Sequence, residues 1–131
     1  MPIPDIFPHE VRATVPPLHS QEGIPDPVVY VKFFTGEWIW YVTEGSPDDY
    51  GDFVFFGFVK GPGEEWGEFS LSELRACADF GLLIERDVDF KPDRLSQIMS
   101  DGRLAFYEYQ ARSSIPCWRE NKFKFSCHIF L

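Results

Sequence analysis

Short runs of β-branched and aromatic residues, separated by segments rich in Gly and Asp, dominate the middle of the chain. Four such runs follow one another, at residues 28–34, 37–43, 52–60 and 66–69. The connection at Thr35-Gly36 is short and contains Gly, which favours a hairpin between the first two runs. Gly57 inside the third run indicates a bulge or a close backbone approach. The pattern therefore predicts a set of consecutive strands.

Helical spacing begins where this pattern ends. Ser70 and Glu73 match a capping box, in which each side chain binds the other residue's backbone amide. Hydrophobic spacing then predicts a helix from about Leu71 to Asp79 that stops near Gly81, followed by a strand over residues 82–87. A second helix is expected to open at Lys91-Pro92-Asp93, because Pro is favoured in the first helical turn, and to run to residues 101–102.

The ends of the chain differ from this core. Residues 1–27 contain seven prolines, which predicts an irregular arm that wraps the domain, with at most one helical turn over Pro8–Val15. Residues 102–131 form an extension in which 103–111 and 122–131 alternate like strands. We therefore expect a single domain over 1–131, with its core at 28–101. Its class is α+β, a mainly antiparallel sheet of four to six strands with two short helices on one face.

The composition excludes several classes of protein. With 131 residues, 44% of them hydrophobic and 18% aromatic, the chain has enough apolar surface for one core and is not a disordered acidic tail. It has neither a run of about 18 apolar residues nor the basic and apolar regions of a signal peptide, so we expect a cytoplasmic protein. The three cysteines are odd in number and form no Cys-x-x-Cys, which indicates a reducing compartment without a disulfide framework.

Charge is distributed unevenly along the chain. Residues 1–100 hold 18 Asp and Glu against 7 Lys and Arg, a balance of −11, whereas residues 101–131 hold 3 and 5, a balance of +2. Binding to the nucleic-acid backbone depends on Lys and Arg that neutralise phosphates, and binding to anionic lipid needs the same sign. The sequence therefore disfavours direct nucleic-acid and membrane contacts and favours a basic protein surface as partner.

The acidic residues are densest between positions 37 and 68, where eight carboxylates stand against the single cation Lys60. The candidate partner-binding patch consists of seven of them: Glu44, Asp48, Asp49, Asp52, Glu64, Glu65 and Glu68. One interpretation is a set of solvated turns, since Asp and Gly form turns. The other is an anionic surface directed at a basic protein. Crowded like charges destabilise a fold, so a cluster of this density suggests a binding role. The spacing of Asp48, Asp49 and Asp52 does not match the ligand positions of a calcium-binding loop.

A candidate aromatic patch accompanies the acidic one. It consists of Trp38, Trp40, Tyr50 and Trp66, which either form the core of the sheet or an exposed patch ringed by carboxylates, a composition typical of interfaces. No Gly-x-Ser-x-Gly and no phosphate-binding Gly loop occurs. His9, His19 and His128 have no ligand partner at helical spacing, although Cys117, Cys127 and His128 would meet if their strands paired. We expect no cofactor, no metal and no catalytic residues.

Several short segments spread over residues 15–95 occur in an order typical of one bacterial family. They include Pro16-Pro17-Leu18, Asp26-Pro27-Val28-Val29, Trp40-Tyr41-Val42-Thr43-Glu44-Gly45, Phe55-Phe56-Gly57, Phe69-Ser70-Leu71-Ser72-Glu73-Leu74 and Ile84-Glu85-Arg86-Asp87. This stretch resembles the domain of unknown function 2958 family, which is often found on plasmids, phages and other mobile elements. The resemblance implies that setting but no activity. His19 departs from the family pattern, in which Tyr is common.

Three functions are open at this point. The first is a non-enzymatic acidic interaction protein of a mobile element, an inhibitor of a host defence or nucleic-acid-handling complex of the anti-CRISPR or anti-restriction type. An acidic surface suits that role because it complements a cationic groove. The second is a small carboxylate-based or metal-assisted enzyme. The third is a structural module that self-associates through an aromatic sheet face.

Overall fold

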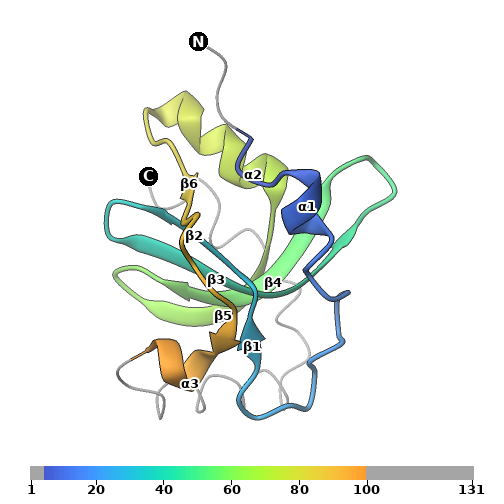
Figure 1. Cartoon of the computed structure of the whole chain (residues 1–131). Helices are drawn as coiled ribbons and strands as arrows, with labels where there is room; N and C mark the ends of the chain where they lie inside the picture. Colours follow the sequence, from blue (N-terminus) through green and yellow to red (C-terminus); the bar gives the residue numbers. More distant parts are fainter. Residues whose placement is uncertain (1–4, 100–131) are drawn as a thin grey trace.

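The computed structural model describes residues 5–99, which form an α+β fold around a five-stranded antiparallel sheet (Figure 1). The strands of this sheet are β2 (Val31–Thr35), β3 (Trp38–Pro47), β4 (Phe53–Lys60), β5 (Glu64–Ser70) and β6 (Glu85–Arg86). Their order is β5-β4-β3-β2-β6, so consecutive strands are neighbours and β6 returns beside β2. A second sheet pairs β1 (Val28–Val29) with β7 (Asp93–Arg94). The predicted class and strand number are confirmed.

The hairpin connections follow the glycines. Thr35 pairs with Trp38, so the turn between β2 and β3 consists of Gly36 and Glu37, and Gly36 has a left-handed φ of 55°. Gly57 on β4 lies opposite Val42, and a β-carbon there would overlap the carbonyl group of Tyr41. The predicted close backbone approach at Gly57 is therefore confirmed. The bulge itself lies on the neighbouring strand β3, between Val42 and Glu44.

The helices are short. Helix α1 (His9–Arg12) falls within the predicted turn, and α2 (Leu71–Ala76) continues into the 3-10 helix η1 (Cys77–Phe80), which ends at the left-handed Gly81. The capping box at Ser70 is present as predicted. Helix α3 (Leu95–Ile98) is shorter than expected, because residues 93–94 pair with β1 as β7 instead of opening the helix.

Both faces of the sheet are covered. On one face Phe33, Trp40 and Phe55 pack with Leu71 and Leu74 of α2. On the other face a second group packs against α3: Val29, Tyr41, Phe56, Phe58, Trp66, Leu95 and Met99. The two main helices therefore lie on opposite faces, whereas we expected both on one. Period-2 alternation explains the two apolar faces of β4, since successive side chains point to opposite sides of a strand.

The N-terminal arm contributes to the first of these cores. Phe7 is 1% exposed, and its ring centroid lies 4.8 Å from that of Phe53 and 4.9 Å from that of Phe55. Cys77 is buried, and its thiol donates to the Glu73 carbonyl. Cys117, Cys127, His128 and the strand-like segments after residue 102 lie outside the described residues. Between residues 5 and 99, no helix is long and apolar enough to cross a membrane.

Candidate functional site

The structure does not bring the seven residues of the predicted acidic patch together on one surface. Asp48, Asp49 and Asp52 belong to the β3–β4 connection, at the end of the sheet where β5 finishes. Glu64 and Glu65 begin β5 at the opposite end, beside Lys60. Because β4 is eight residues long, these two ends are about 25 Å apart. Glu44 lies in the interior, and Glu68 is buried on β5.

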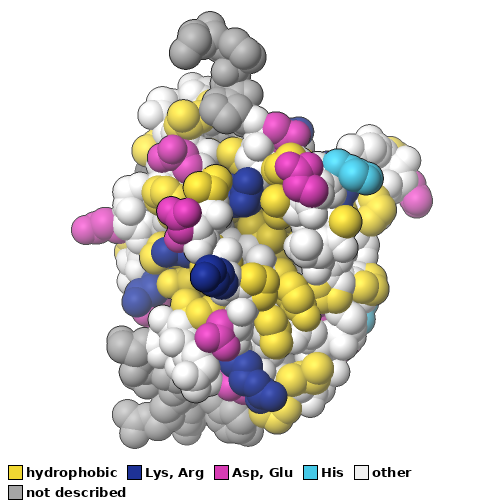
Figure 2. Space-filling model, in the orientation of Figure 1, with side chains coloured by type: hydrophobic (Ala, Val, Ile, Leu, Met, Phe, Trp, Pro, Cys, Tyr) yellow, Lys and Arg dark blue, Asp and Glu magenta, His cyan; other side chains and the backbone are white. Residues whose placement is uncertain are grey.

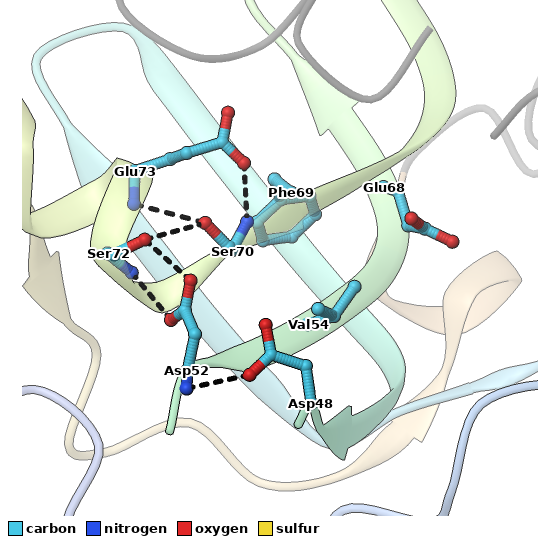
Figure 3. A pocket seen from close by; sticks show the side chains of 8 residues that line it. All are labelled: Asp48, Asp52, Val54, Glu68, Phe69, Ser70, Ser72 and Glu73. Carbon is cyan, nitrogen blue, oxygen red and sulfur yellow. Dashed lines mark hydrogen bonds between the residues drawn. The ribbon is translucent and has the colours of Figure 1, made fainter. Parts of the chain in front are cut away.

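An acidic hollow of about 230 Å³ lies between the β3–β4 connection, the end of β5 and the start of α2 (Figure 3). Eight residues line it: Asp48, Asp52, Val54, Glu68, Phe69, Ser70, Ser72 and Glu73. Four of them are carboxylates, and the described residues contribute no Lys or Arg to its lining. We call this site the acidic hollow.

Asp52 joins the β3–β4 connection to the start of α2. Its Oδ1 accepts the backbone N–H groups of Phe53 (2.8 Å) and Ser72 (3.1 Å), and its Oδ2 accepts the Ser72 hydroxyl at 2.6 Å. A carboxylate is favourable here because the first amides of a helix have no partner within the helix. Ser70 and Glu73 complete the arrangement: the Ser70 hydroxyl accepts the Glu73 N–H, and the Glu73 carboxylate accepts the Ser70 N–H.

The Asp48 side chain binds backbone amides of the β3–β4 connection. Its Oδ1 accepts the N–H groups of Tyr50 and Asp52, each at 2.9 Å, an Asx-type arrangement that favours turns. The other carboxylate oxygen points into the acidic hollow in Figure 3. Asp49 is exposed at the tip of the connection, and Tyr50 beside it is 93% exposed. The connection therefore presents negative charge and one aromatic ring to solvent.

The electrostatics of the acidic hollow favour the ionised form of Asp52. Burial raises the pKa of Asp52, but hydrogen bonds from Ser72, Phe53 and Ser70 outweigh it, so its pKa lies below the ordinary 3.8. A general acid needs the opposite shift. Residues 5–99 contain no group of three or more His, Cys, Asp or Glu side chains arranged to hold a metal ion. The arrangement is suited to accepting a cationic group from outside.

Glu44 has a different role, because it is fully buried. Its two oxygens accept the backbone N–H groups of His19 (2.8 Å) and Gln21 (2.9 Å). The Gln21 side chain in turn binds the backbone of Val28 and Thr43. His19 has a left-handed φ of 75°. Glu44 therefore ties the arm to the bulge of β3 and is not part of a surface patch.

The aromatic residues do not form a common surface. Trp40 is completely buried on the α2 face, stacked on the half-buried Trp38 at 6.0 Å, whereas Trp66 is 6% exposed and belongs to the α3 face. Tyr50 alone of the four is fully exposed. The core interpretation of the tryptophans is therefore confirmed, and an exposed patch made of Trp38, Trp40, Tyr50 and Trp66 together is wrong.

Three polar residues of the acidic hollow are missing from the sequence-based site: Ser70, Ser72 and Glu73. Two of them, Ser70 and Glu73, were identified as a helix cap. Their contribution to a shared hollow with Asp48 and Asp52 depends on the pairing of β4 with β5, which joins Val54 to Ser70. No local sequence pattern reports that pairing.

Comparison with known proteins identifies a family. A family model described as "Protein of unknown function (DUF2958)" matches residues 10–105, a stretch that includes every motif quoted above. No curated protein and no solved structure matches the chain.

Proposed function

The chain belongs to the DUF2958 family, and we propose that this member is a non-enzymatic interaction protein that binds a basic protein surface through the acidic hollow. The proposal is carried by one observation. Four carboxylate residues line a single hollow, and none of its lining residues between 5 and 99 is Lys or Arg.

The carboxylates of the hollow and of the neighbouring β3–β4 connection contribute differently to binding. Asp52 and Glu73 are engaged by the amides and hydroxyls at the start of α2. Asp48 uses one oxygen for the turn and directs the other into the hollow. Asp49 and Tyr50 stand beside it in solvent. A partner's Arg or Lys side chain would enter the hollow toward Asp48, with the Tyr50 ring available for a cation–π contact.

The wider charge of the chain supports association with a basic partner. The balance of −11 over residues 1–100 steers a positively charged surface toward the protein over a Debye length. Proteins that handle nucleic acid present such surfaces, because they neutralise phosphates with Lys and Arg. Our proposal therefore extends to a counter-defence role on a mobile element, in which the acidic protein occupies a groove built for nucleic acid.

The test separates the acidic hollow from net charge. Asp48→Asn with Asp49→Asn removes two charges beside the hollow, and the Asn Oδ1 at position 48 still accepts the turn amides. Glu64→Gln with Glu65→Gln removes two charges at the far end of the sheet. Partners captured from host lysate and identified by mass spectrometry are purified, and their affinity for each double variant is measured by calorimetry at several salt concentrations.

We expect the Asp48/Asp49 variant to weaken binding by about tenfold or more and the Glu64/Glu65 variant to change it much less. Equal weakening by both would show that net charge alone attracts the partner and would overturn the assignment to the hollow. Unchanged binding in both, or a captured partner without a basic surface, would overturn the proposed function. Urea unfolding of each variant confirms that the fold is intact.

A further inference from the structure

The edge of the sheet formed by β6 lies on the far side from β5, which borders the acidic hollow. Arg86 pairs with Phe33, and the Asp87 N–H donates to the Lys32 carbonyl at 3.0 Å. Residues of a strand direct their backbone groups to alternate sides. The N–H and C=O of Arg86 therefore point away from β2, to a side where residues 5–99 supply no further strand.

Two adjoining hollows border this edge. One, of about 180 Å³, is lined by Asp5, Ile6, Leu83, Ile84, Glu85, Arg86 and Val88, and Asp5 is paired with Arg75. The second, of about 210 Å³, adds Leu74 and Ala78 of the α2–η1 helix. Leu83 is 48% exposed and Val88 72% exposed. Figure 2, which shows the face of the molecule in the orientation of Figure 1, has hydrophobic side chains interspersed with charged ones.

Arg86 gives this edge its charge preference. Lys32 pairs with Asp87 at 3.6 Å and Arg75 pairs with Asp5 at 3.1 Å, but Arg86 forms no ion pair with any residue between 5 and 99. Its Nε is buried and has no hydrogen-bond partner within residues 5–99. A half-buried guanidinium in this state is complemented by a carboxylate, which binds it through charge-assisted hydrogen bonds.

We propose that the β6 edge is a second docking surface, which binds an extended peptide segment of a partner protein by strand addition. One peptide residue hydrogen bonds to the backbone of Arg86 and carries Asp or Glu against the guanidinium. A hydrophobic residue two positions along the peptide lies on the same face, because side chains repeat with period 2, and fills the hollow beside Ile84 and Leu83. Backbone bonds supply part of the affinity and the two side chains supply specificity.

A second copy of the chain does not fit this edge. In an antiparallel pair of edge strands, residues whose backbone groups point outward must lie opposite residues that also point outward. If the two strands are related by a two-fold axis, one residue therefore lies at the axis, directly opposite the same residue of the second copy. Centring the pair on Arg86 places two arginines opposite each other. Centring it on Glu85 or on Asp87 places two carboxylates opposite each other. Like charges directly opposite are destabilising, so the edge disfavours self-pairing and favours a peptide with an acidic residue.

The experiment selects ligands without assuming a partner. A phage-displayed library of random linear peptides is panned against the immobilised full chain, and enriched peptides are synthesised and their affinities measured. The variants are Arg86→Glu and, as a more exposed substitution, Leu83→Lys. Arg94→Glu is the matched control, because Arg94 is exposed and lines neither of the two hollows. Peptides N-methylated at alternate amides test strand addition, because only amides that face β6 donate to it.

We expect enriched peptides with Asp or Glu two residues from Val, Ile, Leu or Phe. Their binding should weaken by about tenfold or more in Arg86→Glu and in Leu83→Lys, remain unchanged in Arg94→Glu, and be lost on N-methylation of one alternate set only. Absence of enrichment, peptides without this pattern, or binding that survives both edge variants would overturn the proposal. So would a dimer of the chain that Arg86→Glu dissociates, since that result would assign the edge to a second copy.

Discussion

Replacing Glu44 by Gln is expected to destabilise the fold, because this carboxylate binds the arm and is not a surface charge. Both of its oxygens accept backbone amides, from His19 and from Gln21, and the side chain is completely buried. Gln has nearly the same size and shape but only one acceptor oxygen. In either orientation its NH₂ group therefore faces one of the two N–H donors.

The size of the effect follows from these two bonds. A hydrogen bond to a charged acceptor contributes about 1.5–3 kcal/mol, and a buried donor without an acceptor costs about 1–3 kcal/mol. Loss of one bond and weakening of the other give an expected destabilisation of about 2–4 kcal/mol. For a domain of this size, 1 kcal/mol corresponds to about 4 °C in Tm. The Tm of Glu44→Gln should therefore fall by about 8–16 °C.

The assay is equilibrium urea unfolding followed by tryptophan fluorescence, with hydrogen exchange of single amides measured by NMR. Glu37→Gln is the matched control, because Glu37 is exposed in the β2–β3 turn and its substitution removes the same charge. The control should change stability by less than about 0.5 kcal/mol. In Glu44→Gln, the amides of His19 and Gln21 should lose protection from exchange before the amides of the sheet.

Two results would refute this reasoning. If Glu44→Gln and Glu37→Gln have the same urea midpoint, the carboxylate does not hold the arm. If Glu44→Gln instead keeps its stability but loses a basic partner, Glu44 acts in recognition, as the sequence-based patch proposed.

Three further predictions concern the sheet and the acidic hollow. Gly57→Ala should destabilise the fold by about 3 kcal/mol or more, because its β-carbon would overlap the Tyr41 carbonyl. Gly63→Ala is the control and should be nearly neutral, because Gly63 has open space around it. Equal urea midpoints for the two variants would contradict the close approach at Gly57. Ser70→Ala should lower the urea-derived free energy of unfolding by about 1 kcal/mol through loss of the helix cap, and no change would argue against the cap. The pKa of Asp52, measured by NMR titration, should lie below 3.8. A lowered native pKa stabilises the native state at pH values above the pKa of the unfolded chain, and this stabilisation is lost as the pH falls through the native pKa. Asp52→Asn should therefore lose less stability below about pH 4 than the wild-type protein does. The same decrease in the free energy of unfolding at low pH in both proteins would contradict this.

Local sequence patterns predicted most of the sheet. The runs around Phe33, Tyr41 and Phe55 became β2, β3 and β4, and the cap at Ser70 began a helix as expected. These signals depend only on residues a few positions apart. The segment after Pro92 was predicted as a helix from its first residue, but Asp93–Arg94 pairs with β1, a non-local contact that outweighs helix propensity.

The candidate site was predicted less completely. Asp48, Asp52 and Glu68 line the acidic hollow, while Glu64 and Glu65 lie at the other end of the sheet. A meander places consecutive connections at opposite ends, so acidic residues close in sequence are far apart in space. The two connections that flank β4 lie at its opposite ends whatever the strand order, so the predicted strand already separates these residues. Only the pairing of β4 with β5 decides which residues join Asp48 and Asp52 in the hollow.

By itself the sequence determined the alternation that gives β4 two apolar faces, the cap of α2 and the acidic balance of residues 1–100. Each of these is a property of composition or of short spacing. Tertiary structure alone decided the position of Glu44. Without a bulge it would share a face with Trp40 and Val42, but the extra residue at Thr43 shifts the phase of β3, so that Glu44 lies opposite Phe56 and meets the arm. One added residue reverses the face of every side chain that follows it, and only the pairing of β3 with β4 shows where that residue is.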